Sequence, residues 1–139
     1  MLEKCDSKSS LVSIIKNNLD YVFGVYTSVS WNKNSAWTSD PKSFLFSVRR
    51  NGITKNDKFL NKGPYAFYGG PKGNGNSIFF YGDIVICNQS DKTFGSTCAL
   101  GLYFQLPSVI SGGSEKAQQF LAGNNNQWLT TEIEVYQIN

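Results

Sequence analysis

Two glutamates near the end of the chain, Glu132 and Glu134, come closest to a catalytic pair in type and spacing. They lie in a run rich in β-branched residues, and side chains two positions apart on a strand share one face. Two carboxylates held together in this way can act as general acid and base or bind a cation. The simpler interpretation, which we favour, is a solvent-facing row opposite Ile133 and Val135.

Composition restricts the other catalytic arrangements, because the sequence contains no histidine. This excludes a Ser-His-Asp or Cys-His arrangement and a histidine-ligated zinc ion. Residues 70–77 are close to the phosphate-binding loop pattern, but Asn76 occupies the position of the lysine that contacts phosphate. Residues 78–81 are typical of a strand, whereas that loop needs a helix after it. We therefore expect a glycine loop here, and no catalytic residues, metal or cofactor in the protein.

Three tryptophans, Trp31, Trp37 and Trp128, lie in polar surroundings that contain asparagine. Sugar-binding β-sandwiches use aromatic rings beside amide side chains, because the ring face stacks on C–H groups while the amides bond hydroxyls. The simpler interpretation, which we favour, is that these rings pack across the edges of a sheet. A carbohydrate-binding β-sandwich is therefore the second functional hypothesis.

Positive charge is concentrated between residues 42 and 72, although the whole chain carries only +3. Seven cations against the single acid Asp57 give this segment +6, which leaves −3 for the remainder. The interpretation that we favour is a solvated loop region whose lysines resist aggregation. The functional alternative is a docking patch for an acidic protein or an anionic lipid head group. With +3 overall and no RNA-binding motif, we expect no nucleic-acid partner. The residues predicted to dock a partner are Arg49, Arg50, Lys55, Lys58 and Lys62.

Short strands separated by turn residues are expected to position these groups. Residues 44–50 alternate most clearly, with Phe44, Phe46 and Val48 on one face of the strand. Residues 17–20 are expected to join the first two strands as a hairpin. We predict strands over residues 11–16, 21–28, 44–50, 78–87, 99–106 and 130–138.

The segments between these strands predict turns and little helix. Residues 51–52 form a tight-turn signal, and a long irregular segment is expected to follow it. A bulge is expected at residues 82–83, inside the fourth strand. Ser114 is a candidate cap for a short helix over residues 115–122, which Gly123 would end. Six strands with hairpin-like connections predict a mainly β fold, a two-layer antiparallel β-sandwich with little flanking helix.

Signals for a membrane or for secretion are not found in the sequence. No apolar run is long enough to cross a bilayer, and the first residues have no apolar signal-peptide core. We therefore expect a cytoplasmic protein without a membrane span. The cysteines Cys5, Cys87 and Cys98 are odd in number and lack metal-binding spacing, so we interpret them as free structural thiols.

Two blocks near opposite ends of the chain, residues 23–47 and 120–138, resemble the TLDc domain family in their order and separation. The middle block, residues 80–86, is similar to the family pattern but poorer in glycine, and Val25 replaces a glycine of the first block. The residues that carry the resemblance, which it implies to be structural, are Phe23, Gly24, Tyr26, Trp31, Asp40, Pro41, Phe44, Phe46, Gly82, Asp83, Leu121, Ala122, Gly123, Glu132 and Glu134.

The resemblance implies a β-sandwich with helices at its flanks that works as a non-enzymatic protein-interaction module. Members of the family are linked to protection against oxidative stress and to binding of the vacuolar proton-pumping ATPase (V-ATPase). The expected partner is therefore a protein, with V-ATPase subunits as candidates. Residues 1–139 are expected to form a single TLDc-like domain, shortened at its N-terminus, because the family's helical segment before residues 5–6 is not seen in the sequence.

Overall fold

The structure is a computed structural model. It describes residues 8–29, 37–63, 67–68, 77–81, 83–87, 90–92, 94, 96–98, 100–101, 103–107, 110, 114–124 and 127–138. In these ranges the chain forms two five-stranded antiparallel sheets and one short helix, α2 (Glu115–Gln119). No helix in them has the length and apolar character needed to cross a membrane.

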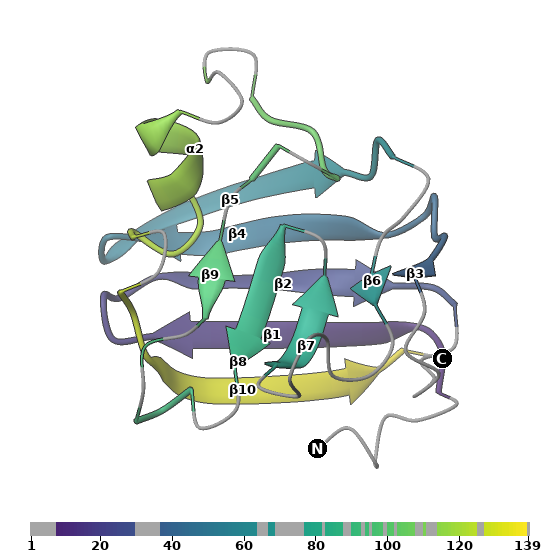
Figure 1. Cartoon of the computed structure of the whole chain (residues 1–139), viewed down its shortest axis with the longest axis horizontal. Coiled ribbons are helices and arrows are strands. Elements are labelled where there is room, and N and C mark those ends of the chain that lie inside the picture. Colours follow the sequence, from purple (N-terminus) through teal and green to yellow (C-terminus); the bar gives the residue numbers. More distant parts are fainter. Residues whose placement is uncertain are drawn as a thin grey trace.

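The large sheet brings the two ends of the described chain together, because the last strand pairs with the first. Its strands, in spatial order, are β10 (Thr130–Gln137), β1 (Leu11–Asn17), β2 (Val22–Thr27), β4 (Phe44–Arg50) and β5 (Ile53–Leu60). All neighbouring strands pair antiparallel. β10 and β5 come first and last in the order, so they are the two edges of the sheet. Figure 1 shows these strands running side by side, with β5 at the top and β10 at the bottom.

The small sheet lies over one face of the large sheet, and its longer strands run across those behind them (Figure 1). Its strands, in spatial order, are β3 (Trp37–Thr38), β6 (Phe67–Tyr68), β7 (Ser77–Tyr81), β8 (Ile84–Cys87) and β9 (Thr97–Cys98). Side chains from both sheets form one buried cluster. The predicted antiparallel β-sandwich with little helix is confirmed.

The core lies between the sheets and is closed by loops. Alternate residues of β1, β2 and β4 point into it, which is the period-2 pattern of a strand with one buried face. The fully buried members of the core are Leu11, Ile15, Phe23, Val25, Leu45, Phe59, Ile84, Ile86, Cys98, Leu100, Phe104, Leu121, Ala122 and Trp128. The ring of Trp128 packs edge-on against Phe23, with 5.6 Å between the ring centres.

Four predicted strands are confirmed, but the predictions for the middle of the chain were partly wrong. Residues 53–60, expected to be irregular, form β5. Residues 78–87 form a hairpin of β7 and β8 instead of one bulged strand. The region 99–106 is not a continuous strand: Phe104 makes an isolated bridge to Asn61, and residues 100–101 form a turn. The helix is shorter than expected, although Ser114 caps it as predicted.

The buried face of β4 is not the aromatic one. Leu45 and Ser47 are buried, whereas Phe44 and Phe46 are half-buried and Val48 is exposed. The large sheet therefore presents aromatic rings on its outer face, which is the far side in Figure 1.

Candidate functional site

The five cations predicted to dock a partner are distributed along the β4–β5 hairpin and its exit. We call this group, Arg49, Arg50, Lys55, Lys58 and Lys62, the basic edge. It forms because β4 and β5 pair along their length and β5 is the last strand of the sheet. The solvated-loop interpretation of this segment was wrong in structure, since Lys55 and Lys58 are strand residues.

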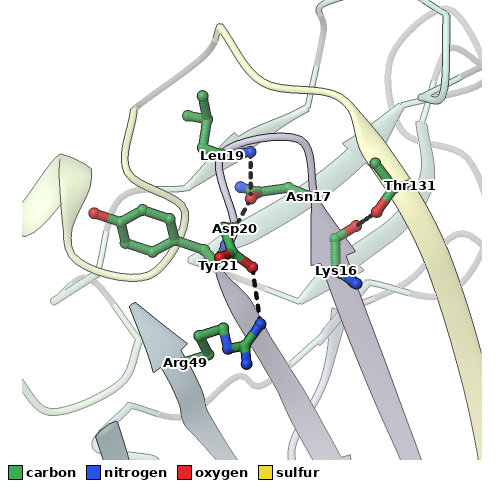
Figure 2. Close-up of polar contacts among 7 residues, drawn as sticks. All are labelled: Lys16, Asn17, Leu19, Asp20, Tyr21, Arg49 and Thr131. Atoms are coloured by element: carbon green, nitrogen blue, oxygen red, sulfur yellow. Dashed lines mark hydrogen bonds and ion pairs between the residues drawn. The ribbon is translucent and has the colours of Figure 1, made fainter. Parts of the chain in front are cut away.

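Two members of the basic edge are already neutralised within the chain. Arg49 Nη1 lies 3.1 Å from Asp20 Oδ1, in the turn between β1 and β2 (Figure 2). Arg50 Nη1 lies 2.7 Å from Asp57 Oδ2, and its guanidinium covers the ring of Phe120 at 4.1 Å. Arg50 therefore ties β4 to the segment after α2, and the charge left for a partner belongs to the lysines.

The three lysines of the basic edge are exposed to solvent. Lys58 Nζ lies 4.2 Å from the centre of the Phe44 ring, on the outer face of the sheet. Among the described residues, none of the three takes part in an ion pair. Sequence reasoning missed the acids Asp20 and Asp57 that neutralise the arginines; the only signal was that Asp57 is the single acid in the basic segment.

Asp40, from the first family block, holds the loop that follows β2. Its buried carboxylate accepts hydrogen bonds from the Ser28 amide (2.6 Å), the Ser28 hydroxyl (2.5 Å) and the Val29 amide (3.4 Å). The Asp40 carbonyl accepts from the amide (3.0 Å) and hydroxyl (2.7 Å) of Ser43, which closes the turn at exposed Pro41. All these hydrogen-bond partners are groups of the same chain. Asp40 therefore fixes the loop after β2 and the turn before β4 to each other.

Asp83, from the middle block, plays the same part in the turn between β7 and β8. Its buried carboxylate accepts from the amides of Gly101 (3.0 Å), Tyr103 (2.8 Å) and Phe104 (3.1 Å). Because the amides of Gly101, Tyr103 and Phe104 all point to one carboxylate, this segment cannot form the continuous strand predicted over residues 99–106. Its neighbour Gly82 lies outside the described residues, as do Trp31 and the glycine loop at 70–76.

The C-terminal motif Leu121-Ala122-Gly123 packs against the turn between β1 and β2. Leu121 and Ala122 are fully buried. Asn17 Nδ2 donates to the Ala122 carbonyl (2.8 Å), while its Oδ1 accepts from the amides of Leu19 and Tyr21 (3.0 Å each; Figure 2). Asn17 was expected only as a turn residue, and its position at the start of that turn was the only signal.

The first block contributes the centre of the large sheet. Phe23 is in the core, whereas Tyr26 points outward and stacks on Phe44 at 5.1 Å. Gly24 lies between them under the ring of Phe46, where a Cβ would collide with that ring and with the Ser13 carbonyl. Phe23, Gly24 and Tyr26 therefore pack on both faces of β2.

The carboxylates of Glu132 and Glu134 lie on the opposite edge of the sheet from the basic edge. Both are exposed on β10, which confirms the solvent-facing row. Together with Ile14, Lys16 and Val22 they line a shallow hollow of about 100 Å³ on the outer face. The Tyr136 hydroxyl donates to Glu134 Oε2 (2.5 Å); this bond and the negative charge of Glu134 raise the pKa of Tyr136.

Two further chemical candidates are buried. The Trp128 side chain is fully buried, so its ring offers no face to a sugar, and the side chains of Trp31 and Trp37 lie outside the described residues. The Cys98 thiol is also fully buried; burial raises its pKa strongly, and the charge of Asp83 adds to the shift. Within the described ranges, no group of three acidic, cysteine or histidine side chains could hold a metal ion.

Two antiparallel sheets around one core, with loops fixed by the buried carboxylates of Asp40 and Asp83, define a β-sandwich domain. The model of the TLDc domain family matches residues 1–139, so the chain belongs to the TLDc domain family. No curated protein matches the sequence.

Proposed function

We propose that this TLDc domain is a non-enzymatic, cytoplasmic protein-interaction module that docks on the V-ATPase through the basic edge. Membership of the TLDc family supports a protein-interaction module in general. The observation that supports a non-enzymatic role concerns the two buried aspartates of the family motifs. Asp40 and Asp83 are buried and each accepts three hydrogen bonds from its own chain, so neither is available to a substrate.

The lysines of the basic edge supply the proposed docking chemistry. Arg49 and Arg50 have intramolecular acids beside them, but Lys55, Lys58 and Lys62 direct positive charge to solvent. Such charges act over several ångströms, raise the rate of association with an acidic surface and lose strength as salt screens them. An acidic surface on a V-ATPase subunit is the partner that fits them.

The proposed link to oxidative-stress protection runs through the partner and not through the Cys98 thiol. The Cys98 thiol is buried with a raised pKa, and a thiol must ionise and be accessible to react with oxidants. Protection would then follow from the effect of the domain on proton pumping.

Binding to purified V-ATPase at low and physiological salt tests the proposal. The double variant Lys55→Glu/Lys62→Glu should bind at least ~10-fold more weakly than the wild type, with a shallower dependence on salt. Lys92→Glu is the matched control, because Lys92 is exposed and belongs to the turn at residues 90–92, which is hydrogen-bonded to Thr130 at the opposite edge of the sheet. If the wild type does not bind, the V-ATPase is not the partner; if all three proteins bind equally, the docking site lies elsewhere.

A further inference from the structure

The outer face of the large sheet carries rows of side chains that run across all five strands. Strand register defines one row, which consists of Glu134, Ile14, Gly24, Phe46 and Lys58. The next row in the same register consists of Tyr136, Val12, Tyr26, Phe44 and Leu60. Both rows are apolar at the centre of the sheet, and no described helix or strand is stacked on this face.

Large apolar side chains are left in contact with water on this face. Val48 is 38% exposed, Leu60 50% and Tyr136 51%. The half-buried rings of Tyr26 and Phe44 stack on each other on the same face. A contiguous apolar patch with charged groups at its rim is the usual appearance of a protein-binding surface.

Opposite charges stand at the two ends of the first row. Glu134 is on β10, at one edge of the sheet, and Lys58 is on β5, at the other edge. Among the described residues, neither takes part in an ion pair. Glu134 is bonded to the hydroxyl of Tyr136, and Lys58 lies over the ring of Phe44.

This arrangement is complementary to itself. Two copies can stack face to face with a two-fold axis parallel to the strands, so that β10 of each copy lies over β5 of the other. Glu134 then meets Lys58 of the second copy twice, and Gly24 lies at the axis. With the axis perpendicular to the strands, Glu134 would meet Glu134, and the like charges would repel.

The shape of the face agrees with the pairing of opposite edges. The hollow lined by Ile14, Lys16, Val22, Glu132 and Glu134 lies on the β10 side of the axis. The two-fold operation places it opposite the β4–β5 side, where Val48 is exposed and Lys58 carries its ammonium. The apolar floor suits Val48. The two carboxylates of the hollow outnumber its single ammonium, that of Lys16, so its net negative charge suits Lys58.

We infer that the outer face of the large sheet is the interface of a symmetric homodimer, held by the apolar rows and by two reciprocal Glu134–Lys58 pairs. Five strands ~4.8 Å apart and about six residues of ~3.4 Å along them give a footprint of roughly 500 Å² on each copy. The total of about 1,000 Å² is at the lower limit for a specific interface, so the dimer is weak and depends on concentration.

Sedimentation velocity from ~10 µM to ~1 mM tests this inference in the full chain. The wild type should change from monomer to dimer over this range. Lys58→Glu and Glu134→Lys should each raise the dissociation constant at least ~10-fold, because each reverses both symmetry-related pairs. Lys62→Glu, at the same edge but outside the rows, should leave it unchanged.

An equimolar mixture of Lys58→Glu and Glu134→Lys gives the decisive measurement. In the mixed dimer both pairs are again opposite in charge, so association should return although neither variant dimerises alone. Circular dichroism melts show whether each variant is folded; if one is not, Lys58→Gln and Glu134→Gln replace the pair and should each weaken the dimer. A wild type that stays monomeric at ~1 mM, or a mixture that does not associate, overturns the inference and leaves the face to a different protein. Neither result depends on V-ATPase binding, which is measured separately with Lys55 and Lys62.

Discussion

The side-chain amide of Asn17 and the carbonyl of Ala122 are joined by a buried 2.8 Å hydrogen bond that spans 105 residues of sequence. The same side chain closes its own turn through the amides of Leu19 and Tyr21. One residue thus joins the turn before the first family block to the second family block.

Replacement of this amide should destabilise the domain. Asn17→Ala removes three hydrogen bonds and leaves the Ala122 carbonyl buried without a partner, so the free energy of unfolding should fall by about 2–3 kcal/mol. Asn18→Ala is the control in the same turn, since it removes one exposed bond to Leu129 and should cost less than about 1 kcal/mol. Urea denaturation measures both, and equal losses would show that the Asn17–Ala122 bond contributes nothing special.

Gly123 tests the contact between the C-terminal motif and the first turn. Its φ is +85°, and a Cβ there would lie 2.6 Å from the ring of Tyr21. Gly123→Ala should therefore cost about 1 kcal/mol for the backbone and at least about 1 kcal/mol more for displacing the ring. Gly52→Ala shares the positive φ (+77°) but meets only the Asp20 carboxylate, so the difference between the variants isolates the Tyr21 contact. Matching thermal melts of the two variants would contradict this packing.

The Asp83 carboxylate should be irreplaceable even by its own amide. Asp83→Asn keeps the shape of the side chain but supplies one acceptor oxygen for three amides and brings a buried NH₂ group beside them. We expect a loss of about 2–3 kcal/mol and faster hydrogen exchange at Gly101, Tyr103 and Phe104. Asp91→Asn, at an exposed turn, should change neither quantity.

Ionisation of Cys98 should make stability fall in mild alkali. The thiol has a raised pKa in the folded state, so above pH ~8.5 the unfolded chain loses this proton first, which lowers the free energy of the unfolded state relative to the folded one. Each pH unit then lowers the stability by up to about 1.4 kcal/mol relative to a Cys98→Ala variant. Urea titrations of the two proteins from pH 7.5 to 9.5 measure the difference.

Thiol reactivity gives an independent measure of the same burial. In a Cys5→Ser/Cys87→Ser background, Cys98 should react with a disulfide reagent only after the chain unfolds. Rapid reaction of the folded protein would place this thiol at the surface and would reopen a direct redox role.

Strands with one buried face could be predicted from the sequence, because apolar residues recur at every second position where one face of a strand is buried. Residues 11–17 and 44–50 alternate in this way and are flanked by turn residues. β5 could not be found by the same signal, since Phe59 is its only buried residue. Its place is set by pairing with β4, which leaves no periodic pattern in an exposed edge strand.

The strand predictions around Asp83 were wrong for a different reason. Residues 78–87 and 99–106 are rich in β-branched and aromatic residues, and this local composition predicts two long strands. The Asp83 carboxylate instead collects amides from Gly101, Tyr103 and Phe104, which are about twenty positions away. The basic residues of the candidate site were visible in the sequence, but their pairing with Asp20 and Asp57 depends on the register of β4 and on the turn before β2.

The pairing of β10 with β1 also determines when the domain can fold during its synthesis. β1 leaves the ribosome more than a hundred residues before its partner, and Trp128, a main part of the core, emerges just before β10. One side of β1 therefore stays unpaired in the nascent chain until residues 130–137 have been synthesised. A premature stop codon anywhere before residue 130 would release a chain with an unpaired strand and an incomplete core, a substrate for chaperones and proteases.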